Sequence, residues 1–216
     1  MNGKDKMEKN VYIRNKYYKL LLIGFFIERA IKRMTKRTVD FLEDFVQEKE
    51  KIVDIGAGGG WISQEMQKRK KTENTLVDVI NLNQTDLPVI LYDGENIPFR
   101  DNTFDTALLI SVLHHCENPS RVLLEAKRVV KNKIIVMEDI AKTPFGEVAL
   151  RFKDAVTNIG FCLMANSFRE MINLPFHFKK ISGWEQIFKD LNLQIVYKKE
   201  FRPFLNHHSI GFILKK

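Results

Sequence analysis

Apolar residues in the first fifty positions recur every three or four residues, which is the spacing of one face of a helix. The members of this stripe are Ile13, Tyr17, Leu20, Gly24, Ile27, Ile31, Met34, Phe41 and Phe45. We therefore expect one or two helices before residue 50. A second apolar stripe, at positions 22, 25 and 26, requires the first helix to be covered on two sides or to contact an apolar partner.

After residue 50 the pattern changes to short apolar runs that alternate with helical stretches, which is typical of an α/β fold with a parallel sheet. The expected strands are Lys51–Ile55, Thr75–Val79, Val89–Tyr92, Phe104–Ile110, Lys133–Glu138, Gln194–Lys199 and Ile210–Leu214. The expected helices are Trp61–Lys68, Pro119–Val130 and Gly183–Leu191. Because a short connection joins the last two strands, we expect them to form an antiparallel hairpin.

Local signals mark the ends of two of these helices. Asn118 followed by Pro119 is typical of an N-cap with proline at the first helical position, and Asn132 is expected to close the same helix. Ser182 and Glu185 have the spacing of a capping box. The pattern thus predicts a helix that begins at residue 119 and another that begins at residue 183.

The connection between the second and third strands is unusually short. Nine residues, including Pro88, separate Val79 from Val89. A parallel crossover with its helix normally takes a dozen or more residues. We therefore expect a loop in place of that helix.

Four glycines, at positions 56, 58, 59 and 60, follow the first strand and precede a helix. Such a turn brings backbone amides close to a ligand at a helix N-terminus. A dinucleotide-binding turn would have Gly or Ala at the position of Trp61, and a nucleoside-triphosphate loop would continue with Lys and Ser or Thr. The turn therefore disfavours NAD, ATP and GTP.

An aspartate stands at the carboxyl end of each of the first three strands: Asp54, Asp78 and Asp93. The carboxyl ends of parallel strands meet at one crevice, so these side chains are expected to surround a single ligand. Asp54 would repel a pyrophosphate but suits a ligand with an ammonium or sulfonium group, and Asp78 can accept hydrogen bonds from ribose hydroxyls. This combination favours S-adenosylmethionine as the cofactor.

The residues that carry these features also match a known family. The runs VDIGAGGGW, LVDV, LYDGENIPFRDNTFDTALLISVLHHCENPSRVLLEAKRVVKN and KIIVMEDI resemble the class I S-adenosylmethionine-dependent methyltransferases, in particular the branch that includes quinone-biosynthesis C-methyltransferases. The resemblance covers residues 51–140. With the apolar pattern it predicts a Rossmann-like, doubly wound, mostly parallel seven-stranded sheet with an antiparallel C-terminal hairpin, N-terminal helices and a helical insert after the fifth strand.

The resemblance also implies roles for individual residues at the cofactor. The methionine portion would be held by Asp54, Gly56, Gly58 and Gly60, the ribose by Asp78, and the adenine edge by Asp93 and Gly94, while Ile110 and Ser111 would lie near the sulfonium. The shortened stretch at residues 80–88 departs from the family, which usually has a helix there beside the adenosine.

Methyl transfer from a sulfonium is an in-line displacement, so the enzyme mainly aligns the reacting atoms and excludes water. An acidic acceptor would also use a general base at the carboxyl ends of the strands. His114 and His115 follow the fourth strand, and Glu138 and Asp139 end the fifth. We favour His115 and Glu138 as catalytic residues; the alternative is that the histidine pair is a structural cap.

Charge and composition narrow the partners. The chain has a net charge of +8, and residues 1–38 hold 11 Lys/Arg against 3 Asp/Glu, so the whole excess is N-terminal. A basic segment beside an apolar run suits an anionic membrane surface better than a nucleic acid, although a solvated helix would have the same pattern.

The longest apolar run is too short to cross a bilayer, and no signal peptide is expected. The two cysteines indicate neither a disulfide framework nor a metal site. We expect a cytoplasmic protein, with peripheral contact to a membrane surface as the further possibility that the basic segment raises.

The segment at residues 141–181 is rich in phenylalanine and methionine, which suits a cover over an apolar substrate as well as an ordinary helical core. We expect one domain over residues 1–216, with an N-terminal cap (1–50), a cofactor-binding core (51–140), this insert (141–181), and a last helix with the hairpin (182–216). The expected activity is methylation of a small hydrophobic acceptor, a quinone or lipid precursor. The alternatives are an RNA or protein methyltransferase and a non-catalytic S-adenosylmethionine-binding regulator.

Overall fold

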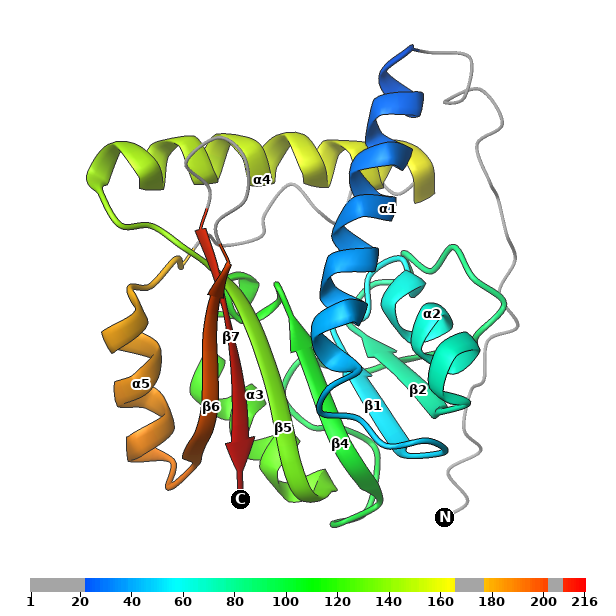
Figure 1. Cartoon of the computed structure of the whole chain (residues 1–216), viewed down its shortest axis with the longest axis vertical. Coiled ribbons are helices and arrows are strands. Elements are labelled where there is room, and N and C mark those ends of the chain that lie inside the picture. The colour runs from blue at the N-terminus through cyan, green and yellow to red at the C-terminus, as the bar shows by residue number, and fades with distance from the viewer. Residues whose placement is uncertain (1–21, 166–176, 202–207) are drawn as a thin grey trace.

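A computed structural model describes residues 22–165, 177–201 and 208–216 and contains a seven-stranded sheet in the order β3-β2-β1-β4-β5-β7-β6 (Figure 1). The strands are β1 (Lys51–Ile55), β2 (Glu73–Asp78), β3 (Val89–Leu91), β4 (Phe104–Ile110), β5 (Val130–Ile140), β6 (Gln194–Phe201) and β7 (His208–Lys215). The first five are parallel, and β7 inserts antiparallel between β5 and β6. The predicted mostly parallel sheet with an antiparallel C-terminal hairpin is confirmed.

Helices cover both faces of the sheet because each has one apolar face. α1 (Leu22–Leu42) and α2 (Trp61–Lys70) pack on one face, where Val39, Leu42 and Met66 join the buried side chains of β1, β4 and β5. α3 (Pro119–Val129) and α5 (Ile181–Asp190) pack on the other face, where Trp184 and Phe188 belong to the larger apolar core. Within the described residues α1 is one continuous helix that ends before Phe45.

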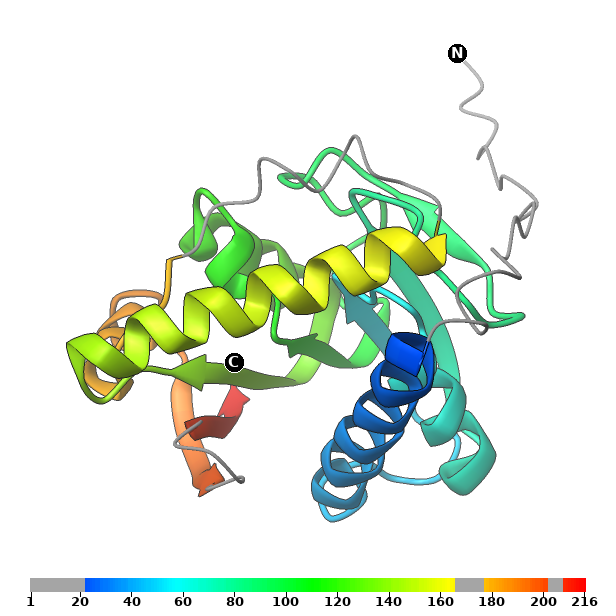
Figure 2. The ribbon, with the colours of Figure 1, turned by 90° about the horizontal axis from the view of Figure 1, so that it is seen from above.

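One further helix, α4 (Pro144–Ala165), lies across the carboxyl ends of the parallel strands (Figures 1 and 2). It is the described part of the predicted helical insert. Of the aromatic and methionine residues predicted to cover a substrate, the side chains of Phe161 and Met164 and the whole of Phe168, Met171 and Phe176 lie outside the described residues. Among the helices that the structure describes, none combines the length and apolarity needed to cross a bilayer.

The start of α3 is confirmed and its end is corrected. The Asn118 side chain accepts a hydrogen bond from the backbone N–H of Arg121, as expected for an N-cap ahead of proline. Asn132 does not close this helix. The chain leaves α3 at Val129 and enters β5 at Val130, which pairs with Phe104, so residue 132 already lies in the strand.

The predicted capping box of α5 is wrong. The helix begins at Ile181, with Lys180 at the N-cap position, so Ser182 lies inside the first turn. Glu185 instead forms an ion pair with Lys198 of β6, with 2.8 Å between nitrogen and oxygen. The local pattern failed because burial of Trp184 and Phe188 against the sheet fixes where this helix starts.

The connection between β2 and β3 has no helix, as its length predicted. Its loop is held by Asn83, whose side-chain oxygen accepts hydrogen bonds from the N–H and hydroxyl of Thr85 at 2.9 and 2.8 Å. The backbone N–H of Gln84 donates to the carbonyl of Gly59 at 3.0 Å. The shortened loop therefore packs on the glycine turn.

The first testable prediction concerns the core beneath α5. Trp184 is fully buried, so Trp184→Ala should leave a cavity and lower the free energy of unfolding by about 3–5 kcal/mol. Urea denaturation followed by circular dichroism measures this change. The matched control is Gln186→Ala on the exposed face of the same helix, for which we expect a change within about 0.5 kcal/mol. Equal stability of the two variants would contradict this account of the core.

Candidate functional site

The glycine turn between β1 and α2 is packed against the protein at Gly56 and open to a ligand at Gly58. Gly56 has φ of +69°, and a Cβ there would lie 2.1 Å from Cγ2 of Val112, so only glycine fits. Gly58 has φ of +53°, and a Cβ there would meet no described atom within 4 Å. The turn therefore presents backbone to a space that a ligand can enter.

Asp54 and Asp78 form an acidic wall beside this turn. The Asp54 carboxylate accepts a hydrogen bond from the Ser63 hydroxyl at 2.7 Å, and burial, with a smaller effect of Asp78, raises its pKa to about 6. The Asp78 carboxylate accepts hydrogen bonds from the backbone N–H of Gly58 at 2.8 Å and of Val79 at 2.7 Å. Burial nevertheless raises the pKa of Asp78. Both carboxylates would be stabilised by a cationic ligand.

Asp93 differs from these two buried acids. It follows β3 and is exposed, and it accepts hydrogen bonds from the backbone N–H groups of Glu95 and Asn96 and from the Asn96 side chain. These bonds, that of the Asn96 side chain above all, lower its pKa to about 2. Gly94 beside it has φ of +85°. Asp93 is thus a charged residue fixed within its own loop.

Ile110 and Ser111 lie where β4 leaves the sheet. Ser111 has φ of +54°, and its backbone N–H donates to the carbonyl of Met137 in β5 at 2.7 Å. The next residue, Val112, contacts Gly56, so the end of β4 and the glycine turn are neighbours. The structure therefore brings the predicted residues of β1, β2 and β4 to one edge of the sheet.

Glu138 is fully buried and occupied by three hydrogen bonds. Its Oε1 accepts from the backbone N–H groups of Val112 and Leu113 at 3.0 and 2.8 Å, and its Oε2 lies 2.6 Å from Nδ1 of His114. Both carboxylate oxygens therefore hold the turn that follows β4.

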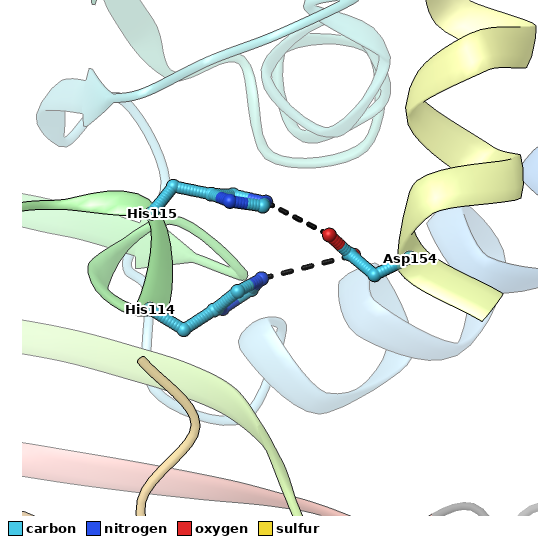
Figure 3. Close-up of side chains that lie close together, drawn as sticks. All are labelled: His114, His115 and Asp154. Atoms are coloured by element: carbon cyan, nitrogen blue, oxygen red, sulfur yellow. Dashed lines mark ion pairs between the residues drawn. The ribbon is translucent and has the colours of Figure 1, made fainter. Parts of the chain in front are cut away.

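The two histidines converge on a residue that the sequence pattern did not reveal, Asp154 of α4 (Figure 3). Nε2 of His115 lies 3.2 Å from Oδ2 of Asp154, and Nε2 of His114 lies 3.7 Å from Oδ1. Leu150 and Asp154, four residues apart, are both buried. That spacing is the signal that could have indicated a face of this helix turned toward the sheet.

The electrostatics of this cluster are dominated by its carboxylates. Burial alone would lower the pKa of His114, but Glu138 and Asp154 outweigh it and raise that pKa to about 10. Burial alone would raise the pKa of Asp154, but the neighbouring imidazoles of His114 and His115 bring that pKa well below its usual range. The cluster thus favours a negatively charged Asp154 and a positive charge beside it.

Cys116, next to the histidines, is half-buried, and burial raises the pKa of its thiol to about 12. The thiol donates to the carbonyl of Val112 at 3.4 Å. A thiol that stays protonated is a poor nucleophile and a poor metal ligand. The side chain of Cys162 lies outside the described residues.

Comparison with known proteins agrees with this geometry. A family model described as "Methyltransferase domain" matches residues 53–137. The uncharacterized protein MJ1252 of Methanocaldococcus jannaschii is 32% identical over 241 residues, covering 98% of this chain and 86% of that protein. The uncharacterized protein MJ1123 of the same organism is 33% identical over 112 residues, covering 49% of this chain and about half, 53%, of that protein.

Two further proteins carry a described activity. A demethylmenaquinone methyltransferase of Corynebacterium urealyticum is 25% identical over 203 residues, covering 85% of this chain and 84% of that protein. The crystal structure of a SAM-dependent methyltransferase from Aquifex aeolicus superposes with a TM-score of 0.58 at 17% identity, covering 82% of this chain and 87% of that one. At that identity the superposition shows the fold.

The glycine turn, its acidic wall, the sheet order and the matched family agree on one cofactor, S-adenosylmethionine. The chain therefore belongs to the class I S-adenosylmethionine-dependent methyltransferases.

Proposed function

We propose that this methyltransferase acts on a small hydrophobic acceptor, a quinone or lipid precursor, that it takes from a membrane surface. The observation that carries the proposal is a row of exposed apolar side chains on α4. Figure 2 shows the backbone of this helix lying across the carboxyl ends of the strands. Phe145 and Phe152 of this row are 80% and 73% exposed. The whole row is Phe145, Val148, Phe152, Val156 and Ile159.

The two faces of α4 have different partners. Leu150 and Asp154 are buried toward the sheet, while the apolar row is exposed. Large exposed apolar side chains in one row mark a surface that contacts a partner, a membrane or an apolar ligand. A lipid surface is favoured here because the excess of positive charge lies in residues 1–38, a range that includes most of α1, and α1 contacts α4.

The likeness to a demethylmenaquinone methyltransferase over most of both chains supports the same acceptor class. We treat residues 1–216 as one domain, in which residues 51–140 bind the cofactor and α4 covers the acceptor. The alternatives are an RNA or protein acceptor and a regulator that binds the cofactor without turnover.

The residues at the glycine turn fit S-adenosylmethionine. The open side of Gly58 accepts the methionine portion, with Gly56 and Gly60 shaping the turn, and Asp54 faces its ammonium group. Asp78 accepts from the ribose hydroxyls, Asp93 and Gly94 border the adenine, and Ile110 and Ser111 border the sulfur. When bound, S-adenosylmethionine supplies an electrophilic methyl group on a sulfonium.

The residues after β4, at the end of β5 and on α4 prepare the site for the acceptor. His115, whose side chain is 14% exposed, is held by Asp154 and can activate an acidic hydroxyl or carbon. Glu138 holds the turn that carries both histidines, so we now assign it a positioning role. α4 excludes water from the reacting atoms. Transfer forms a bond between the acceptor and the methyl carbon, breaks the carbon–sulfur bond and releases S-adenosylhomocysteine.

The second testable prediction concerns the ribose contact. Asp78→Asn keeps the size of the side chain but removes the charge that two ribose hydroxyls would bond to, so S-adenosylhomocysteine should bind about 10–100-fold more weakly. Isothermal titration calorimetry measures the affinity. The control is Asp86→Asn in the exposed part of the following loop, which should leave it unchanged. An unaltered affinity in Asp78→Asn would remove this residue from the cofactor site.

The third prediction concerns pH. Because Asp54 has a raised pKa of about 6, it is charged at neutral pH and becomes protonated as the pH falls through 6. The ligand ammonium loses its partner there, so affinity for S-adenosylhomocysteine should fall about tenfold between pH 7.5 and pH 5. Asp54→Asn should bind weakly with little dependence on pH across this range. A wild-type affinity that stays level to pH 5 would contradict the ammonium contact.

The fourth prediction tests the acceptor class. Wild-type protein should methylate a demethylated naphthoquinol with a short prenyl chain when it is embedded in anionic vesicles. The double variant Phe145→Ser/Phe152→Ser should lower that turnover at least tenfold while binding S-adenosylhomocysteine normally, since its two largest exposed apolar side chains are lost. Thr157→Ala on the same helix is the control and should retain activity.

Other outcomes of this assay would replace the proposal. Methylation of RNA or protein from a lysate, with salt-dependent binding and no turnover of the quinol, would indicate a macromolecular acceptor. Tight cofactor binding without methylation of any lysate component would indicate a regulator. Equal activity of the double variant and the wild type would show that the apolar row does not serve the acceptor.

A further inference from the structure

The cluster of His114, His115 and Asp154 has a geometry that the cofactor site does not use. One nitrogen or oxygen from each residue lies within 4.8 Å of the others (Figure 3). The histidines come from the turn η2 (Leu113–His115) after β4, and Asp154 comes from α4. The sequence pattern did not predict a metal here, because the residues that meet are about forty positions apart.

His114 is oriented for ligation through Nε2. Its Nδ1 lies 2.6 Å from the Glu138 carboxylate, which fixes the ring and makes Nδ1 the hydrogen-bearing nitrogen of the neutral imidazole. The ring is also stacked on Phe178, with 4.6 Å between centroids. A carboxylate that orients the far nitrogen of a histidine is the usual outer contact of a metal-binding imidazole.

The Nε2 atom of His114 is buried and has no hydrogen-bond partner among the residues that the structure describes. It faces Oδ1 of Asp154 at 3.7 Å, which is too long for an N–H···O hydrogen bond. A metal-binding imidazole is neutral, and in that form Nε2 and Oδ1 are two acceptors, so a bound cation takes the place of the proton that otherwise gives His114 its positive charge. Ligands of a tetrahedral zinc ion, each about 2.0–2.2 Å from the metal, are roughly 3.4 Å apart.

The other distances agree with this spacing. Nε2 of His115 lies 3.2 Å from Oδ2 of Asp154, and the His114 and His115 rings have centroids 4.0 Å apart. The Asn158 side chain donates to Oδ2 of Asp154 at 3.0 Å, which holds the carboxylate in place. Two imidazoles and one carboxylate are ligands that Zn²⁺ prefers, and three protein ligands leave one position open.

We propose that His114, His115 and Asp154 bind a divalent transition-metal ion, Zn²⁺, whose open position takes a hydroxyl oxygen of the acceptor. This role rests on the proposed function, whereas binding of the metal does not. The ion lowers the pKa of the bound hydroxyl, which loses its proton to water and binds as an oxyanion. The acceptor class is thereby narrowed to phenols and enols. With the ion bound, His115 is a metal ligand, and it activates the acceptor hydroxyl by holding the ion that binds this hydroxyl.

The fifth prediction tests the site with zinc alone. Full-length protein treated with a chelator and then dialysed should bind one equivalent of Zn²⁺, measured by calorimetry and by competition with a chromophoric chelator. Asp154→Asn and His115→Ala should each bind it at least tenfold more weakly. Glu138→Gln should weaken binding about 10–100-fold through the orientation of His114. Glu147→Gln, an exposed carboxylate on the same helix, is the matched control and should bind as the wild type does.

Two further measurements make the result decisive. Circular dichroism and the affinity for S-adenosylhomocysteine verify that each variant is folded. If Asp154→Asn does not fold, the zinc affinity of His115→Ala tests the site instead. Cobalt substitution should give the visible absorption of a four- or five-coordinate ion, lost in His115→Ala. No stoichiometric uptake by the wild type, or equal uptake by the variants, would overturn the metal site. Metal binding with no turnover of any quinol or phenol would overturn the proposed acceptor and leave the site standing.

Discussion

The buried carboxylate of Glu138 fixes the connection on which the site depends. Through its two oxygens it holds the backbone of Val112 and Leu113 and the ring of His114. Val112 in turn packs against Gly56, so the position of the glycine turn follows from the same contact. Hydrogen bonds to a charged group contribute about 1.5–3 kcal/mol each, and removing this carboxylate would leave buried donors without a partner. One side chain thus connects the glycine turn to the histidine pair.

The acidic residues at the strand ends divide into two kinds by their surroundings. Asp54 and Asp78 are buried close together, and their mutual repulsion adds to the effect of burial in raising the pKa of Asp54. Asp93 is exposed and saturated with hydrogen bonds, so it is charged at any physiological pH. The first pair therefore has an unfavourable interaction that a cationic ligand would relieve, whereas the charge of Asp93 is already stabilised by hydrogen bonds within its own loop. Such raised pKa values are characteristic of functional sites.

The sequence predicts those elements of the fold whose causes lie within a few residues of one another. The apolar runs located all seven strands, and the Asn118 cap and the short loop at residues 79–88 were found because their causes lie within a few residues. Asn132 and Ser182 were misread because packing of β5 and α5 on the rest of the fold decides where those elements begin.

The candidate site was only half predictable for the same reason. The glycines and acids follow their strands directly, so their meeting at one edge follows from the parallel order of the sheet. Asp154 reaches the histidines only through the placement of α4, and the three bonds of Glu138 depend on how the turn after β4 folds over β5. Glu138 is predicted as a base from its place at the end of a strand, whereas the contacts that favour the proposed positioning role are tertiary and cannot be read from the sequence.

Helix α4 has two different faces, one that contacts the strand ends and one that is apolar and exposed. Asp154 and Lys153 tie it to the strand ends, the first to the histidines and the second to Asp139 at 2.9 Å. Its outer row is apolar, so anything that draws that row into a lipid surface also acts on the helix that supplies Asp154. Exposure of such a row has a cost in water that contact with an apolar partner removes. Under the proposed function, engagement of the acceptor and assembly of the histidine cluster would therefore be linked through this one helix.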